Sequence, residues 1–172
     1  MLCEYPGLGN DSATEGIESL SDLAQTLLRD LPPRCDVVAL SMGSAVALRL
    51  ALEQPERVRR LVLVAAAGGV DVRGLGGLDW RDAFRQRRPL APSWFLDDEV
   101  DLSERLHRVT APTLLVFGDQ DWIAPVAVGE HLLARLPSAK LEVVAGATHD
   151  IEEQEPDLLA SLIEAHLRGV PR

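Results

Sequence analysis

The sequence has few positive charges and few aromatic residues. Lys and Arg total 17 against 27 Asp and Glu, which gives a formal net charge of -10, and aromatic residues make up only 4% of the chain. A strongly negative protein repels the phosphates of nucleic acids and the head groups of anionic lipids. The charge balance therefore argues against nucleic acid and membrane surfaces as partners.

Cysteine is also scarce, and long apolar runs are absent. The two cysteines, Cys3 and Cys35, do not form the dense framework of a small disulfide scaffold, so we expect reduced, structural thiols. No run approaches the roughly 20 apolar residues that cross a bilayer. The N-terminus lacks a basic segment followed by an apolar one. The sequence therefore predicts a cytoplasmic protein, unless a signal precedes the printed N-terminus.

What is present is the alternation of strands and helices typical of an α/β domain. The 172 residues are 47% apolar, which is enough for one domain with a substantial core, and we assign 1–172 to it. Valine- and leucine-rich runs predict buried strands at 35–40, 59–67, 112–118 and 140–146. Helical patterns lie within 19–33, 41–55, 125–136 and 156–167. We therefore predict a mainly parallel sheet with helices on both faces.

One long segment breaks this alternation. From Gly68 to about His107 the chain is rich in Gly and Pro and shows no sustained period. An ordinary connection has roughly 4 to 6 residues. Because long excursions at the strand ends of such sheets often cover a site, we predict a lid at 68–107 within the domain.

The stretch VVALSMGSA places a serine where a predicted strand turns into a helix. Such a turn, the nucleophile elbow, lifts the Ser41 hydroxyl above the sheet on a strained backbone. The strand and the helix pack closely there, so the neighbours of the serine must be small, as Ala39, Gly43 and Ser44 are. The usual elbow pattern G-x-S-x-G is A-x-S-x-G in this sequence. The structural alternative is a serine that only caps the following helix.

A serine nucleophile needs a base, and the base needs an acid to orient it. Asp119 and Asp121 follow the third predicted strand, and His149 follows the fourth. Catalytic groups of open α/β sheets gather at the carboxyl ends of strands, so we predict a triad of Ser41, Asp121 and His149. Asp119 is nearer its strand and better placed to fix the turn. Taken singly, the acids are also explained as turn residues and His149 as an exposed loop residue.

These stretches resemble the α/β-hydrolase superfamily, of the bacterial esterase-like type. The resemblance rests on VVALSMGSAVALRLALEQPERVRRLVLV, APTLLVFGDQDWIAP and AGATHDIEEQEPDLL and covers nearly the whole chain. It implies that Ser41 is the nucleophile, His149 the base and Asp121 the orienting acid, in the order Ser, Asp, His. The departures from the family pattern are Ala39 for the usual glycine, Leu40 for a frequent histidine and Ser44 for a frequent glycine.

The same resemblance gives a meaning to EYPGLGND at residues 4–11. In that family an early His-Gly loop supplies an oxyanion donor, and a later Pro-Gly-x-Gly loop precedes the elbow. Residues 4–11 resemble the later loop, because another strand with its helix would need roughly 30 more residues before 35–40. We therefore hypothesise an N-terminally truncated hydrolase. The Met42 N–H would then supply one oxyanion donor, with no clear second.

Truncation would also leave the predicted strand 35–40 without a neighbour on one side. Exposed strand edges pair readily with other strands. We therefore expect that two copies of the chain could form a homodimer through this edge.

Several weaker sequence signals have ordinary structural explanations. Four aromatic residues of the excursion are candidates for an apolar acyl pocket, although packing of the excursion explains them equally well: Trp80, Phe84, Trp94 and Phe95. GGVDVRGLGGLDW lacks the spacing of a dinucleotide or phosphate loop, and the acids after His149 lack a second histidine at helical spacing, so we predict no cofactor and no metal. The basic cluster RDAFRQRRPL is interpreted as solvated charge rather than as an anion site.

The sequence thus predicts a serine hydrolase that acts on a small-molecule carboxylic ester or related acyl compound through an acyl-enzyme. Two alternatives stay open. One is a catalytically silent hydrolase fragment that acts as a binding or dimerising module. The other is a carbon-carbon bond hydrolase or perhydrolase on the same triad, because one fold hosts many chemistries.

Overall fold

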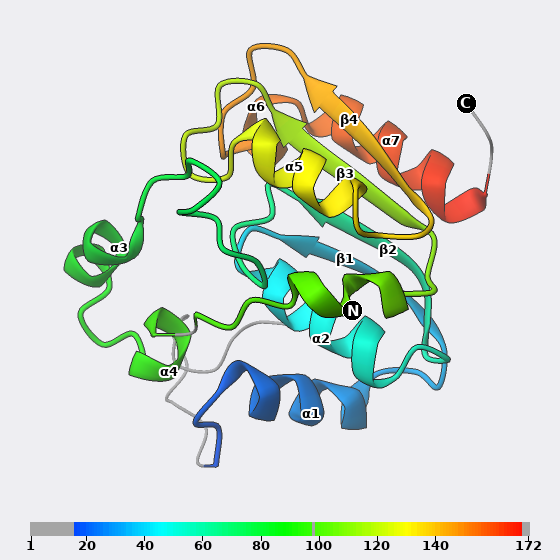
Figure 1. Cartoon of the computed structure of the whole chain (residues 1–172), viewed down its shortest axis with the longest axis horizontal. Helices are drawn as coiled ribbons and strands as arrows, with labels where there is room; N and C mark the ends of the chain where they lie inside the picture. The colour runs from blue at the N-terminus through cyan, green and yellow to red at the C-terminus, as the bar shows by residue number, and fades with distance from the viewer. Residues whose placement is uncertain (1–15, 98, 170–172) are drawn as a thin grey trace.

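The computed structural model describes residues 16–97 and 99–169, and within them the chain forms one four-stranded parallel sheet. The strands are β1 (Cys35–Leu40), β2 (Val58–Val64), β3 (Thr113–Gly118) and β4 (Ala139–Val144). They lie in the order β1-β2-β3-β4, and each neighbouring pair is parallel (Figure 1). The predicted α/β class with a parallel sheet is confirmed.

Helices cover both faces of this sheet, as predicted. The longer helices are α1 (Leu20–Asp30), α2 (Gly43–Glu53), α5 (Val126–Leu133) and α7 (Pro156–Arg168). The short ones are α3 (Arg81–Arg87), α4 (Ser93–Leu96), the 3-10 helix η1 (Ser103–Arg108) and α6 (Ile151–Gln154). In Figure 1, α2 and α5 lie in front of the sheet, with α1 against α2, and α7 lies behind it. No helix in the described residues is long and apolar enough to span a membrane.

Alternate residues of β2 serve the two faces. Leu61 and Leu63 belong to the core beneath α2 and α5, whereas Val62 and Val64 belong to the core beneath α7, and all four are at most 2% exposed. Side chains of a strand alternate between faces, so a strand covered on both sides must be apolar at every position. This explains why the valine- and leucine-rich run predicts β2 well.

β1 differs from the prediction of a buried strand. Val38 is 48% exposed and Leu40 is 40% exposed, although Ala39 between them is buried. The reason is position, because β1 ends the sheet in the described residues and the core beneath α7 is built from β2, β3 and β4. One face of β1 is therefore covered and the other is not.

Side chains hold both ends of α1. The Ser19 hydroxyl accepts a hydrogen bond from the Asp22 N–H at 3.0 Å, which caps the helix. At the other end the Arg57 guanidinium donates to the carbonyl oxygens of Leu28, at 3.0 Å, and Leu31, at 2.7 Å. These carbonyls have no partner within the helix, so Arg57 both satisfies them and anchors α1 to the segment before β2.

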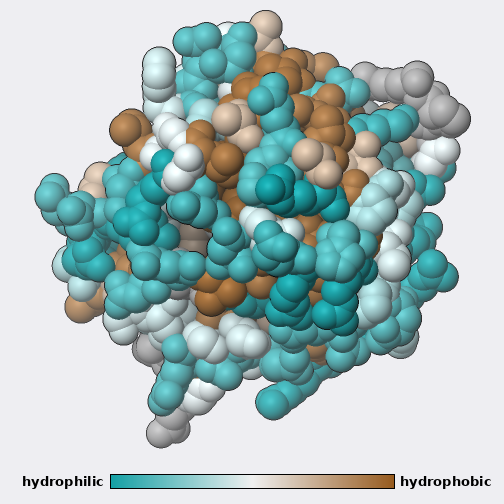
Figure 2. Space-filling model, in the orientation of Figure 1, coloured by the Kyte–Doolittle hydropathy of each residue, from teal (hydrophilic) through white to brown (hydrophobic). Residues whose placement is uncertain are grey.

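The excursion projects beyond the carboxyl ends of the strands. Figure 1 shows α3 and α4 on the side toward which the strand arrows point. Figure 2 shows hydrophilic residues over most of the viewed face, as the composition leads one to expect, with a hollow left of centre beside the excursion. The part of the excursion that carries α3 and α4 therefore lies next to the strand ends that precede the predicted triad residues, whereas η1 runs back along α2 toward the start of β3.

Two half-buried histidines should make the stability of the fold depend on pH. Burial lowers the pKa of His166 below its ordinary value of 6.5, despite a hydrogen bond to the Pro112 carbonyl, and burial also lowers the pKa of His131. As the pH falls through 6.5, the unfolded chain gains protons before the folded chain does. The free energy of unfolding should therefore decrease as the pH falls from 6.5 toward the lowered pKa values that the two histidines have in the folded protein.

The test is urea unfolding at about pH 7.5 and about pH 5.5, on either side of the ordinary histidine range. We expect His166→Gln to lose less stability between these two pH values than the unmodified protein, because one of the two histidine protonations that favour unfolding has been removed. The same change at the exposed His107 is the matched control. An unchanged pH dependence in His166→Gln would contradict the expectation.

Candidate active site

The parallel register brings three segments to one edge of the sheet. Leu40 at the end of β1 pairs with Val64 at the end of β2, and Gly118 at the end of β3 pairs with Val144 at the end of β4. Carboxyl ends of parallel strands share one edge, so whatever follows them meets there. The three residues of the predicted triad all follow such ends.

Ser41 has a left-handed backbone between β1 and α2. Its φ is 52°, a conformation that costs a non-glycine residue about 1–2 kcal/mol. Its N–H donates to the Val64 carbonyl at 2.9 Å, and its carbonyl accepts from the N–H groups of Ser44, at 3.0 Å, and Ala67, at 3.1 Å. The capping alternative does not apply, because α2 begins after Met42 without a side-chain cap. The Ser41 hydroxyl is thus left for another partner.

Ser44, which the sequence marked only as small, reinforces this turn. Its hydroxyl is fully buried and lies 2.6 Å from the Ser41 carbonyl oxygen and 2.9 Å from that of Gly68. It also accepts the Gly68 N–H at 3.2 Å. The hydroxyl therefore ties the elbow to the loop that follows β2, where a glycine in its place would offer no such bonds.

The carboxylate of Asp121 is fully buried and bonded through both oxygens. Oδ1 accepts the N–H groups of Ile123 and Ala124, each at 2.8 Å. Oδ2 lies 2.8 Å from Nδ1 of His149. Asp119 has a different partner, since its Oδ1 accepts the Gly146 N–H at 2.7 Å and so holds the loop after β4.

His149 links this acid to the serine. Its Nε2 lies 2.8 Å from the Ser41 Oγ, while its Nδ1 faces the Asp121 carboxylate. An ionised carboxylate only accepts hydrogen bonds, so Nδ1 carries the proton and Nε2 is left to accept the serine O–H. In chemical terms the arrangement can remove a proton from a hydroxyl and stabilise the resulting imidazolium.

A glycine at the end of β3 permits this closeness. A Cβ added at Gly118 would lie 2.1 Å from the Ala147 carbonyl oxygen, which no side chain tolerates. The loop after β3, which carries Asp121, and the loop after β4, which carries His149, can therefore contact each other through their backbones. The Gln120 N–H donates to the same Ala147 carbonyl at 2.9 Å.

The other predicted site residues divide into two groups. Met42 is buried beside the elbow, and Trp80 lines a cavity formed by the excursion. Phe84, Trp94 and Phe95 do not line that cavity. They join Trp80 in a cluster of ring pairs with centroids 5.5 to 6.2 Å apart, which packs the excursion internally. Residues 4–11, predicted to form a glycine-rich loop, lie outside the described residues.

A second serine-histidine pair was not anticipated from the sequence. The Ser103 hydroxyl lies 2.7 Å from Nε2 of His131 and joins η1 to α5. Nothing local marks it, because the two residues are far apart in sequence. Within the described residues, no group of three or more His, Cys, Asp or Glu is placed to hold a metal ion.

Comparison with known proteins identifies the family. The protein-family model described as "Alpha/beta hydrolase family" matches residues 2–98, which is more than half of the chain. The chain belongs to the alpha/beta hydrolase family. The matched region contains the elbow and most of the excursion, while Asp121 and His149 lie beyond it. The chain is accordingly a hydrolase.

Similar proteins extend the likeness over nearly the whole chain. A pimeloyl-[acyl-carrier protein] methyl ester esterase of Aeromonas hydrophila is 28% identical over 95% of this alpha/beta hydrolase and 82% of its own length. The Nitrosomonas europaea protein of the same name is 25% identical over 94% and 82%. Among solved structures, a hydrolase from Pseudomonas aeruginosa has a TM-score of 0.78 at 22% identity, covering 95% of this chain and 77% of its own. The structural likeness supports the fold.

The buried hydroxyl of Ser44 leads to a prediction about stability. Ser44→Ala would leave the buried Gly68 N–H without its acceptor, and an unsatisfied buried group costs about 1–3 kcal/mol. Urea unfolding should therefore show a loss of that size. The matched control is Ser21→Ala on the exposed side of α1, which should change stability by less than about 0.5 kcal/mol. Equal effects of the two changes would contradict the role assigned to Ser44.

Proposed function

We propose that this alpha/beta hydrolase cleaves carboxylic esters, or related acyl compounds, with Ser41 as nucleophile. The single observation that carries the proposal is the continuous hydrogen-bonded series from the Ser41 Oγ through His149 to Asp121, with 2.8 Å at each step. Distances of about 2.6–3.2 Å are those at which a base can take a proton from a hydroxyl.

The proposed reaction has two halves. The Ser41 oxygen attacks the ester carbonyl carbon while its proton passes to Nε2 of His149, and that proton then leaves with the alcohol. Water next attacks the acyl-enzyme by the same route, giving the acid and restoring the serine. Asp121 remains ionised, keeps the ring oriented and stabilises the imidazolium in each half.

The negative charge that develops on the carbonyl oxygen requires donors. The Met42 N–H directly follows the nucleophile, and we assign it as one oxyanion donor. The excursion at 68–107 would act as a lid over the reacting groups, because it lies beside the strand ends that carry them.

The similar proteins and the chemistry of the three residues both favour an ester as the substrate. Relatives that align with nearly the whole chain are named methyl ester esterases. The triad needs no cofactor to hydrolyse an ester. Carbon-carbon bond hydrolysis and perhydrolysis remain alternatives on the same residues.

The main experiment measures hydrolysis of p-nitrophenyl butyrate and covalent labelling by a fluorophosphonate. Ser41→Ala should lose at least about 1,000-fold in activity, because the triad acts as a unit, and should lose the label. Ser103→Ala is the matched control, since it also removes a serine bonded to a histidine and should keep both activity and label. Equal rates for the unmodified protein and Ser41→Ala would exclude the mechanism. An unlabelled, inactive protein would favour the silent-module alternative.

Self-association through β1 is a separate proposal. Val38 and Leu40 lie two residues apart on the same face of β1, which ends the sheet in the part of the chain that the structure describes, and both are at least 40% exposed. Two such strands could pair through their free backbone N–H and C=O groups, which would bring these side chains of the two copies next to each other. Sedimentation should then give a species larger than the 18.7 kDa chain.

Val38→Lys should return that species to the monomer, because pairing would place the introduced positive charges of the two copies close together. Val143→Lys on the other edge strand, β4, at 47% exposure, is the matched control and should leave association unchanged. A protein that sediments as a monomer at all concentrations would refute this proposal.

A further inference from the structure

A cavity of about 300 Å³ lies within the excursion, beside the elbow, and the proposed reaction does not use it. Its floor includes Ala67 and Gly68. Ala67 donates its N–H to the Ser41 carbonyl, and a Cβ at Gly68 would lie 2.8 Å from the Met42 sulfur. The floor of the cavity therefore packs directly against the elbow that carries Ser41.

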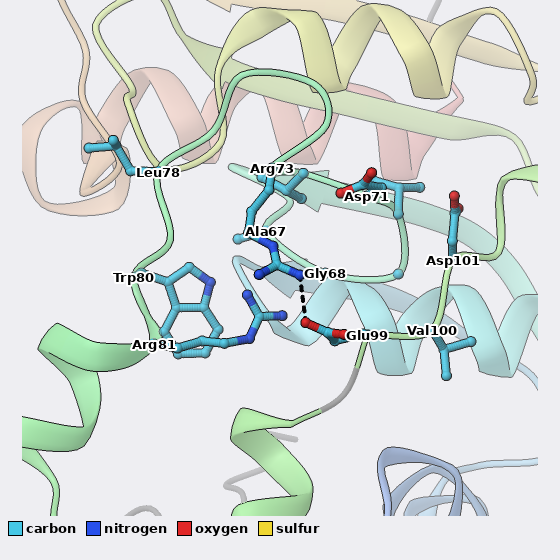
Figure 3. Close-up of a pocket in the computed structure, with 13 residues that line it drawn as sticks. Ala67, Gly68, Asp71, Arg73, Leu78, Trp80, Arg81, Glu99, Val100 and Asp101 are labelled. Carbon is cyan, nitrogen blue, oxygen red and sulfur yellow. Dashed lines mark hydrogen bonds and ion pairs between the residues drawn. The ribbon is translucent and has the colours of Figure 1, made fainter.

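Two arginines of the excursion meet on one wall of this cavity. Arg73 and Arg81 each place a guanidinium nitrogen 3.4 Å from an oxygen of Asp79, so the two cations flank one carboxylate. Figure 3 shows both guanidinium groups between Trp80 and Glu99, and Arg73 bonded to Glu99. Planar guanidinium groups are suited to binding carboxylates through paired hydrogen bonds.

Arg81 is held in place by its surroundings. Its side chain is only 18% exposed, its Nε–H donates to the Leu96 carbonyl at 2.8 Å, and its guanidinium lies 5.4 Å from the centre of the Trp80 ring. The sequence suggested solvated charge for this basic cluster. Arg81 departs from that expectation, whereas Arg85 on the same helix is 49% exposed and pairs with acids outside the cavity.

The acids on this wall differ in how firmly they are held. Asp79 accepts the backbone N–H of Arg81 at 3.1 Å, which keeps it beside the arginines. Glu99 bonds Arg73 at 2.5 Å through side chains that are 61% and 49% exposed, and exposed ion pairs contribute little to stability. Without Glu99, two arginines and Asp79 carry one net positive charge. A carboxylate from solution can therefore replace Glu99.

The remaining acids of the lining have backbone partners. Asp71 accepts the Gly74 N–H at 2.9 Å, and Asp101 accepts the Ser103 N–H at 2.8 Å. In Figure 3 both lie on the other side of the view from Trp80 and Arg81. They fix turns of the excursion, and the arginine wall is the part of the cavity suited to an anion.

We propose that this cavity binds a carboxylate carried by the ester substrate, with Arg73 and Arg81 as its binding residues and Glu99 as an internal competitor. The inference rests on the proposed ester hydrolysis and defines its substrate class as esters with a second, anionic end. Glu99 holds the place of that end when no substrate is bound.

The test compares two methyl esters of equal chain length, monomethyl adipate and methyl hexanoate, with methanol release as the readout. The unmodified protein should prefer monomethyl adipate. Arg73→Gln should raise KM for monomethyl adipate by about ten-fold, the loss expected for a charged hydrogen bond, with little change for methyl hexanoate. Glu99→Gln should lower KM for monomethyl adipate, because a competing carboxylate is removed. If the two substitutions acted only by disturbing the structure around this ion pair, Arg73→Gln and Glu99→Gln would change KM in the same direction.

Arg85→Gln is the matched control, because it removes the same charge from α3 outside the cavity and should leave both KM values unchanged. Activity on methyl hexanoate reports that each variant is folded. Equal use of both esters, unaltered by Arg73→Gln, would overturn the subsite while leaving the esterase proposal intact.

Calorimetric titration of adipate into the Ser41→Ala protein separates binding from reaction. Binding that Arg73→Gln weakens would support the subsite even if neither ester were hydrolysed, in which case only the proposed function would fail. No binding together with no ester preference would overturn the subsite.

Discussion

The left-handed turn at Ser41 is the constraint on which the site depends. It ends β1 and starts α2 within two residues, so the hydroxyl stands above the sheet instead of pointing into a core. The strain of about 1–2 kcal/mol is small beside the burial of α2, whose residues from Ser44 to Leu52 are all buried. A single fully buried leucine contributes about 1.5–3 kcal/mol. Packing of α2 against the sheet can therefore hold a turn that the isolated chain would avoid.

The parallel register then determines which groups meet this hydroxyl. β3 and β4 pair along their whole length, so the loops after them emerge side by side. Gly118 lets those loops touch through the backbone, and Asp119 fastens one to the other through Gly146. With the loops held in this way, the bond between Asp121 and His149 needs no long or flexible connection. The buried carboxylate orients the ring, and the ring faces Ser41.

In the proposed reaction, selectivity would reside in the excursion, because Ser41, His149 and Asp121 would act on the ester carbonyl group alone. The aromatic cluster around Phe95 joins this segment to the core beneath α2 and α5, and the Leu96 carbonyl holds Arg81 at the cavity wall. Charged side chains on such a support can recognise a substrate group without moving the reacting residues. This separation of chemistry from recognition is consistent with a family in which one fold hosts many reactions.

The sequence by itself determined the strands, the long helices, and the candidates Ser41, Asp121 and His149, because apolar runs and motif order are local properties of a chain. Only the tertiary structure decided contacts between distant segments. It exposed Val38 on β1, packed the aromatic residues of the excursion into one cluster from which Trp80 also lines the cavity, and gave the Ser44 hydroxyl partners on two backbone segments. It also brought Arg73 to Glu99. Such contacts depend on how elements pack, and periodicity along one segment carries no information about its neighbours in space.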